Sequence, residues 1–173
     1  MNYITPYNPE WAQRFQDIRQ ALTPVLPSGC KFHHVGSTSI PGMPAKDIID
    51  IDVECPSGSM QAVIECLAPL GYEHQGDLGI RGREAFRIIP DSQAAALPAH
   101  HLYTCETATS ELLRHLLFRD YLIANPARAA WLANEKASAD AKASSRADYI
   151  ENKNAAYARI VAEVSEWASQ PRS

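Results

Sequence analysis

The sequence predicts an α+β fold: a small mixed β-sheet flanked by helices and followed by a helical C-terminal portion. Three observations predict it. Short apolar runs bounded by turn residues are typical of strands, longer segments repeat apolar residues at helical spacing, and the last third of the chain contains only helical patterns. A chain of 173 residues also suits one domain, which we expect to cover residues 1–173.

The first helix is expected to begin at Pro9, with Asn8 as its cap. Its apolar positions follow a helical repeat: Trp11, Phe15, Ile18, Leu22 and Val25. Residues 30–35 read as a short strand that stops at Gly36. Residues 37–46 contain two prolines and a glycine, which favours a turn or a broken helix.

The apolar run 48–55 predicts a buried strand, and residues 60–70 predict a helix that ends at Gly71. A glycine-rich passage leads to a strand around 85–89, and a further strand is expected around 101–105. Three helices, beginning near Ser110, Pro126 and Ala147, complete the chain.

Composition limits the class of protein. The chain is 46% hydrophobic and 21% charged, with a net charge of -4, which disfavours a general nucleic-acid-coating role. No basic, apolar secretory leader and no apolar run of membrane-spanning length is apparent. The four cysteines are scattered, so free buried thiols are favoured over disulfides or metal ligands. We therefore expect a cytoplasmic protein without a membrane partner.

The most informative stretch is the sequence HVGSTS at residues 34–39. Gly36 comes directly after a predicted strand, so the chain can turn sharply there and bring its amides close to a phosphate. Ser37, Thr38 and Ser39 add three hydroxyl donors. Such a tetrapeptide alone is more often only a turn or a helix cap, but a pair of aspartates later in the chain strengthens the phosphate-binding interpretation.

Twelve residues separate Ser37 from Asp50, and Asp52 lies two positions later in the same predicted strand. Side chains alternate in a strand, so the two carboxylates share a face, about 6.5 Å apart along the chain. Two like charges buried together require a positive partner. Mg²⁺, which prefers hard oxygen ligands, is the simplest candidate. The alternative is a charged device that protects an edge strand against aggregation.

Basic residues offer further phosphate contacts. Lys46 precedes the aspartate strand, and Arg83 and Arg87 would share a face if the later strand begins near Arg83. Solvated surface charges are an equal alternative for the two arginines. Lys153 interrupts an apolar helical stripe and is either a cleft residue or a surface lysine.

The histidines form two adjacent pairs, His33-His34 and His100-His101. Neighbouring strand residues point to opposite faces, so each pair offers one ligand to a given site. This disfavours a zinc-dependent hydrolase, which we keep as a third hypothesis. His34 and His101 are the better candidates for supporting the site from behind its direct ligands.

Gly-Ser, a loop of this length, and then Asp-hydrophobic-Asp resemble the signature of the DNA polymerase β-type nucleotidyltransferase superfamily. More narrowly, the sequence resembles the GrpB family of predicted nucleotidyltransferases over nearly its whole length. The matching pieces lie in the expected order: residues 7–11 with Phe15, 34–42, 45–52, 82–83, 101–102, 114–115 and 118–122.

The resemblance implies a nucleotidyltransferase-type sheet and a Mg²⁺-dependent (or Mn²⁺-dependent) transfer of a nucleotidyl group. The donor would be a nucleoside triphosphate, but the resemblance does not imply an acceptor. We expect a small molecule or a protein side chain, because the net charge of -4 disfavours a long nucleic acid. Asp50 and Asp52 would bind the metal and act in catalysis. Ser37 would contact phosphate together with Gly36, Thr38 and Ser39 of the same turn. Lys46 would be either a phosphate contact or a cation that stabilises the turn.

The sequence departs from the superfamily in one respect. The superfamily generally uses a third carboxylate from a later strand, and the strands expected around 85–89 and 101–105 contain none; only Glu84 and Glu106 flank them. This departure motivates a second hypothesis: a nucleotide- or phosphate-binding module of the same fold without catalytic activity.

Overall fold

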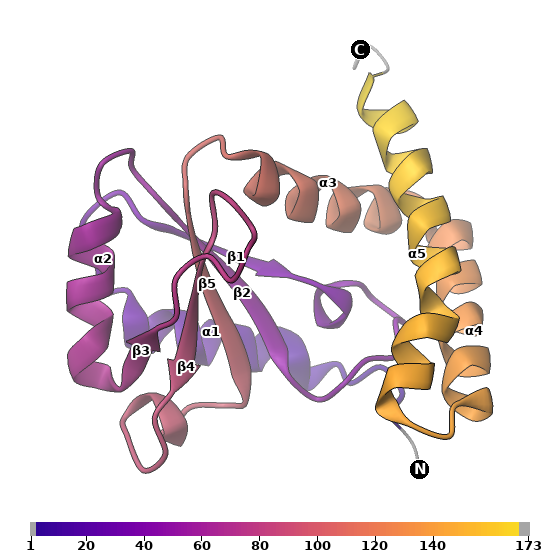
Figure 1. The fold of residues 1–173 in the computed structure, drawn as a ribbon, viewed down its shortest axis with the longest axis horizontal. Helices are drawn as coiled ribbons and strands as arrows, with labels where there is room; N and C mark the ends of the chain where they lie inside the picture. The colour runs from indigo at the N-terminus through magenta and orange to yellow at the C-terminus, as the bar shows by residue number, and fades with distance from the viewer. Residues whose placement is uncertain (1–2, 170–173) are drawn as a thin grey trace.

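A computed structural model describes residues 3–169 and contains a five-stranded mixed sheet with helices around it (Figure 1). The strands are β1 (Lys31–Val35), β2 (Ile49–Cys55), β3 (Tyr72–His74), β4 (Glu84–Ile88) and β5 (His100–Glu106). The helices are α1 (Glu10–Leu22), α2 (Met60–Leu67), α3 (Ser110–Ala124), α4 (Pro126–Lys142) and α5 (Arg146–Ser169). Short 3-10 turns occupy Ser37–Ser39, Ala68–Leu70 and Ala94–Ala96. The predicted α+β class is confirmed.

The sheet order is β1-β2-β5-β4-β3. Strand β2 is antiparallel to β1 and parallel to β5, whereas β4 is antiparallel to both of its neighbours. Strand β2 is therefore internal, with a partner on each side. The interpretation of the Asp50–Asp52 pair as an edge-strand device is wrong, because β2 is not at an edge.

Most predicted elements lie where the patterns put them. Helix α1 begins at Glu10 with Pro9 at its N-cap position, one residue later than expected, although the side chain of Asn8 still accepts a hydrogen bond from the Glu10 amide. Two further details differ. The helix expected over 60–70 changes to a 3-10 turn after Leu67 before Gly71 ends it at φ +97°. Strand β3 was not expected, because three residues, two of them polar and exposed, carry no periodic pattern.

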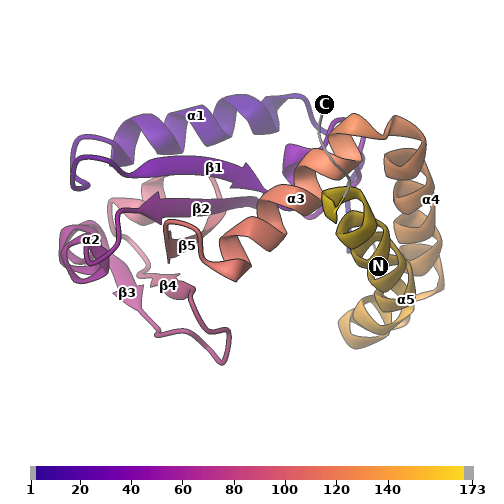
Figure 2. The same cartoon turned by 90° about the horizontal axis from the view of Figure 1, so that it is seen from above.

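Two apolar clusters divide the molecule. The first joins α1 and α2 to the face of β2 that carries Ile51 and Val53. The second joins α3, α4 and α5, and it also buries Ile40 and Met43 from the segment after the 3-10 turn at Ser37–Ser39. Figures 1 and 2 show α4 and α5 side by side at one end of the molecule, with α2 at the other. The turn predicted to bind phosphate thus leads directly into the helical cluster.

No helix among residues 3–169 combines the length and the apolar character needed to cross a bilayer.

Ile160 of α5 is fully buried in the second cluster, while its neighbour Val161 is 40% exposed. We expect Ile160→Ala to lower the free energy of unfolding by about 2–5 kcal/mol, because it leaves a cavity. Val161→Ala should change it by less than about 0.5 kcal/mol. Urea denaturation of both variants measures the difference, and equal losses would contradict this placement of α5.

Candidate functional site

Strand β2 presents carboxylates on one face and apolar side chains on the other. Asp50, Asp52 and Glu54 alternate with Ile51 and Val53, which are buried in the first apolar cluster. We call Asp50, Asp52 and Glu54 the carboxylate row. The first two members were predicted from the sequence; Glu54, which continues the same alternation, was not.

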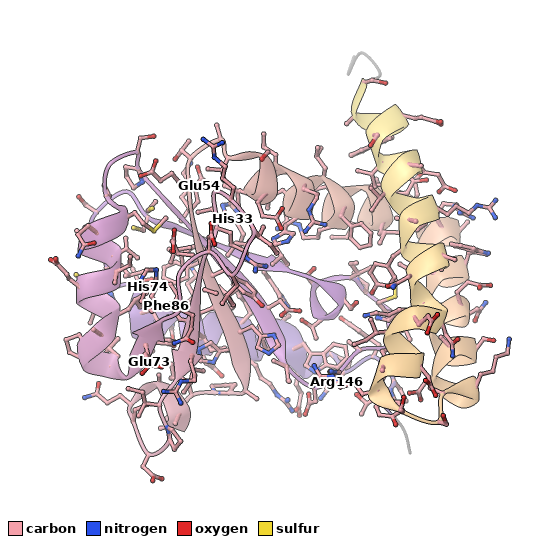
Figure 3. All side chains as sticks on the ribbon, viewed as in Figure 1. His33, Glu54, Glu73, His74, Phe86 and Arg146 are labelled. Atoms are coloured by element: carbon pink, nitrogen blue, oxygen red, sulfur yellow. The ribbon has the colours of Figure 1, made fainter. Side chains whose placement is uncertain are left out.

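Each member of the carboxylate row is hydrogen-bonded to one histidine, and the three histidines come from three different elements. The pairs are Asp50 Oδ1 with His101 Nδ1 of β5 at 2.9 Å, Asp52 Oδ2 with His115 Nδ1 of α3 at 2.6 Å, and Glu54 Oε2 with His33 Nε2 of β1 at 2.8 Å. Figure 3 labels His33 and Glu54, which lie close together. Every carboxylate of the row therefore has an imidazole as its hydrogen-bond partner.

Asp52 and Asp50 differ in exposure. The Asp52 side chain is 0% exposed, and its Oδ1 atom is buried without a hydrogen-bond partner among residues 3–169. The Asp50 side chain is 33% exposed. A buried carboxylate oxygen without a partner is costly unless a cation meets it. Two carboxylates on one face, one with an unpaired oxygen, fit a hard divalent cation that completes its shell with water and phosphate oxygens.

Gly36 brings the turn against Asp50. Its φ is +70°, and a Cβ atom added there would lie 2.5 Å from Asp50 Oδ2. Only glycine combines this backbone conformation with this close approach. Ser39 Oγ donates to the Gly36 carbonyl at 2.6 Å and closes the turn.

Ser37 is the point where the turn meets the C-terminal helices. Its Oγ atom accepts a hydrogen bond from Lys136 Nζ of α4 at 2.7 Å and lies 3.2 Å from the Tyr157 hydroxyl of α5. Lys136 Nζ also donates to the Pro44 carbonyl. These contacts join residues about a hundred positions apart and fix the Ser37 hydroxyl in the lining of a cavity.

That cavity has a volume of about 150 Å³ and lies between the turn, the start of β2 and helices α4 and α5. Asp50, His101 and Ser37 line it together with three lysines, Lys46, Lys136 and Lys153. Burial and the nearby Lys153 charge lower the pKa of Lys136, which is 2% exposed, to about 7. Burial, together with a neighbouring cation, also lowers the pKa values of Lys46 and Lys153. An anion in the cavity would relieve this repulsion.

The other predicted site residues of the turn lie behind it. Thr38 is buried, and its Oγ1 atom lies 2.9 Å from His34 Nε2. The His34 ring stacks on Phe15 of α1, and burial lowers the pKa of His34 to about 4. His34 thus contacts the turn through Thr38 and the first apolar cluster through Phe15, whereas His101 is hydrogen-bonded to Asp50 directly.

The two predicted arginines are not brought to the cavity. The Arg83 guanidinium lies over the Tyr103 ring, 4.4 Å from its centroid, and Tyr103 is the β5 partner of Asp52. Arg87 pairs with Glu73 of β3 at 2.6 Å on an exposed part of the sheet. Arg83 is therefore near the carboxylate row, and Arg87 is at the far side of the sheet.

The histidine pairs divide between the two faces, as strand alternation predicts. His100 bonds to Tyr72 at 2.6 Å, opposite in direction to His101. Over residues 3–169, no group of three or more His, Cys, Asp or Glu side chains is arranged to hold a metal by itself. A histidine-based zinc centre has no structural support within that range.

Glu84 and Glu106 were expected to flank the later strands, but they are the first residue of β4 and the last residue of β5. Neither supplies a third carboxylate to the aspartate pair. Glu84 pairs with His74 at 2.6 Å, and Glu106 accepts a bond from the Gly58 amide at 2.9 Å. The carboxylate that approaches instead is Glu111 of α3, whose Oε1 atom lies 3.1 Å from His115 Nε2. It reaches Asp52 only through that imidazole.

No site role was predicted from the sequence for Lys136, Tyr157, Glu111 or His115, although His115 lies in a piece that matches the GrpB family, and the role of Lys153 stayed open. Two local signals were present. Lys136 occupies the apolar stripe of α4, between Leu132 and Ala139, where a lysine is out of place. Glu111 and His115 are four residues apart and so share one face of α3. Only tertiary packing shows which face that is.

Among solved structures, the RNA terminal uridylyl transferase Cid1 matches with a TM-score of 0.53 and 14% identity, over 79% of this chain and 42% of Cid1. At that identity the likeness shows the fold alone. The fold is nucleotidyltransferase-like, as the resemblance to that superfamily implied.

The family is identified more closely. The family model described as GrpB protein matches residues 3–163, so the chain belongs to the GrpB family. The crystal structure of the conserved protein GrpB from Enterococcus faecalis matches with a TM-score of 0.79 and 33% identity, over 96% of this chain and 99% of that one.

Curated relatives carry names of uncharacterised proteins. The UPF0157 protein YqkA of Bacillus subtilis is 38% identical over 125 residues, 71% of this chain and 35% of YqkA. A UPF0157 protein of Pseudomonas aeruginosa is 32% identical over 171 residues, 91% of this chain and 65% of that protein. The chain thus spans about a third of the first relative and just under two thirds of the second.

We expect Gly36→Ala to destabilise the protein by more than the strain of a positive φ alone, which is about 1–3 kcal/mol. The added Cβ would displace Asp50, because it lies 2.5 Å from Asp50 Oδ2. Gly42→Ala is the matched control: its φ is +76°, and a Cβ there meets nothing within 4 Å. Chemical denaturation compares the two, and equal losses would contradict the close packing of Gly36 on Asp50.

The lowered pKa of Lys136 makes stability depend on pH. Between about 7 and the ordinary value of 10.5, the amine is charged in the unfolded chain and largely neutral in the folded one. Unfolding then takes up a proton, so stability rises with pH. Relative to Lys136→Met, the free energy of unfolding of the wild type should rise by up to about 1.4 kcal/mol per pH unit in this window. A difference independent of pH would contradict the burial of the amine.

Proposed function

We propose that the protein is a Mg²⁺-dependent nucleotidyltransferase that transfers a nucleotidyl group from a nucleoside triphosphate to a small-molecule or protein acceptor. Mn²⁺ is the natural substitute for the metal. The observation that carries the proposal is the convergence of Lys46, Lys136 and Lys153, from three separate segments, on the cavity that holds Ser37 and Asp50.

The cavity suits the phosphate end of the donor. Its volume of about 150 Å³ is below the range of roughly 300–1,000 Å³ typical of pockets that enclose whole ligands. Phosphate groups would therefore lie among the three lysines, with the sugar and base outside. Ser37 Oγ and the amides of the turn after Gly36 add neutral donors on one side.

The metal would be held where the cavity meets the carboxylate row. Asp50 lines the cavity, and Asp52 offers a buried oxygen without a partner within residues 3–169. When bound, Mg²⁺ would neutralise phosphate charge and stabilise the reacting oxygens. The chain's own residues would bind the triphosphate, orient it along β2 and exclude water, since phosphoryl transfer needs positioning more than covalent help.

The net charge of -4 favours an acceptor other than a long nucleic acid. We also propose that the protein is cytoplasmic, because its four cysteines are free and the cytosol keeps thiols reduced. We propose that it forms one domain.

One observation favours a second candidate function. Asp50 and Asp52 each carry an imidazole on one oxygen, and neither Glu84 nor Glu106 joins them. A protein that binds nucleotide or phosphate without transferring it would need the three lysines and the turn but no third carboxylate.

Turnover separates the two functions. With Mg²⁺ and each nucleoside triphosphate in turn, the transferase should release pyrophosphate when its acceptor is supplied from a panel of alcohols, amines and proteins. Asp50→Asn and Asp52→Asn should each abolish that release. The binding module predicts a raised melting temperature, equivalent to about 2.7 kcal/mol at a ligand concentration of one hundred Kd, without product. Neither stabilisation nor product with any triphosphate would reject both.

The cavity lysines can be tested apart from the aspartates. We expect Lys153→Met to weaken triphosphate binding at least tenfold, the effect of losing about 1.4 kcal/mol of charge interaction. Lys142→Met is the control, because Lys142 is exposed near the end of α4 and does not line the cavity. Equal affinities of the two variants, measured by calorimetry, would contradict the assignment of the cavity.

A further inference from the structure

Helix α3 lies over the polar face of the sheet and turns one pair of side chains toward β2. Glu111 and His115 are four residues apart on this helix, so both point the same way. His115 Nδ1 lies 2.6 Å from Asp52 Oδ2, and His115 Nε2 lies 3.1 Å from Glu111 Oε1. The imidazole is therefore held between two carboxylates, one from the sheet and one from its own helix.

Glu111 is itself fixed. Arg114 donates to both of its oxygens, at 2.6 Å and 3.1 Å, and Arg114 Nη2 also lies 3.1 Å from His115 Nε2. Hydrogen bonding to Arg114 lowers the pKa of Glu111, which therefore stays an ionised acceptor. The ring of His115 has little freedom to turn away from Asp52.

The two oxygens of Asp52 have different surroundings. Oδ2 accepts the bond from His115 Nδ1, since an ionised carboxylate can only accept. Oδ1 is buried and has no partner among residues 3–169. The hydrogen bond fixes the side-chain rotamer and leaves one defined oxygen free.

We propose that His115, held in place by Glu111, positions Asp52 so that its free Oδ1 atom serves as the metal ligand. This inference rests on the proposed function, because it assumes that Asp52 binds a divalent cation. Hydrogen bonds of this kind to metal ligands commonly contribute about 10-fold to 100-fold in metal affinity. His115 would act through Asp52 and would not touch the substrate.

The other members of the carboxylate row are held less firmly or are farther from the cavity. His101, which bonds to Asp50, is 53% exposed, whereas His115 is 19% exposed. Glu54 pairs with both His33 and Lys31, so neither of its oxygens is left free. Within the row, Asp52 alone combines a fixed rotamer with an oxygen that has no partner among residues 3–169.

The test measures metal affinity without nucleotide, using Mn²⁺ as the probe and electron paramagnetic resonance to count free ions. His115→Phe keeps a ring but removes both nitrogens, and we expect it to weaken Mn²⁺ binding about 10-fold or more. His115→Asn keeps an amide donor near the position of Nδ1 and should recover most of the affinity. A purely structural histidine would not show this rescue.

A matched control comes from another histidine–carboxylate pair. His74 and Glu84 lie 2.6 Å apart on β3 and β4, away from the carboxylate row, and Figure 3 labels His74. His74→Phe should leave Mn²⁺ affinity unchanged. If His115→Phe does not fold, Glu111→Gln decides, since it keeps the shape of the side chain but removes its charge and should lower the affinity by a smaller factor.

The outcomes separate the inference from the proposed function. One result would overturn the inference alone: the wild type binds Mn²⁺, Asp52→Asn abolishes the binding, and folded His115→Phe and Glu111→Gln leave it unchanged. Loss of affinity in His115→Phe without recovery in His115→Asn also overturns it. No Mn²⁺ binding by the wild type overturns both the inference and the metal part of the proposed function.

Discussion

The structure depends on the need to compensate carboxylates in the middle of a sheet. Strand β2 has a neighbour on each side, and its apolar face is buried, so Asp50, Asp52 and Glu54 must lie together on the remaining face. Each requires a polar partner, because the free-energy cost of burying an unpaired charge is far larger than the net stabilisation from one ordinary hydrogen bond. The partners come from β1, β5 and α3. Compensation of one strand thus fixes the positions of three other elements, and the candidate site is where they meet.

The site has an acidic half and a cationic half. The first half of the sequence contributes the turn, the carboxylates and Lys46, and the C-terminal helices contribute Lys136, Lys153 and Tyr157. Strand β2 packs in the first apolar cluster, and the C-terminal helices form the second. Ile40 and Met43, from the segment after the turn, nevertheless pack in the second cluster. A ligand with concentrated negative charge matches the cationic half, and a divalent cation matches the acidic one.

Much of the fold and part of the site can be predicted from the sequence. The strands and helices with clear periodicity lie where expected, because local pattern decides them; β3, with three residues, has no pattern to read. The turn at Gly36 and the aspartate pair can be predicted from the sequence, because their residues are adjacent or alternate within one strand. The site roles of Glu111, His115 and Lys136 cannot be predicted in this way, since they come from contacts between distant parts of the chain. Of these, Lys136 gives the clearest local signal, as a charge within an apolar stripe.

The bond between Lys136 and Ser37 has a consequence for how the protein acquires its site. It closes a loop of ninety-nine positions, and closing a long loop costs chain entropy that only the surrounding packing can offset. The Ser37 hydroxyl in the cavity lining is therefore positioned by a contact that forms only when the intervening sheet and helices are already assembled. A partly folded chain would hold Asp50, Asp52 and Lys46 close together in sequence but would lack the lysines that α4 and α5 contribute. Competence to hold an anion is thus expected to arise late in folding and to disappear early when the helices loosen.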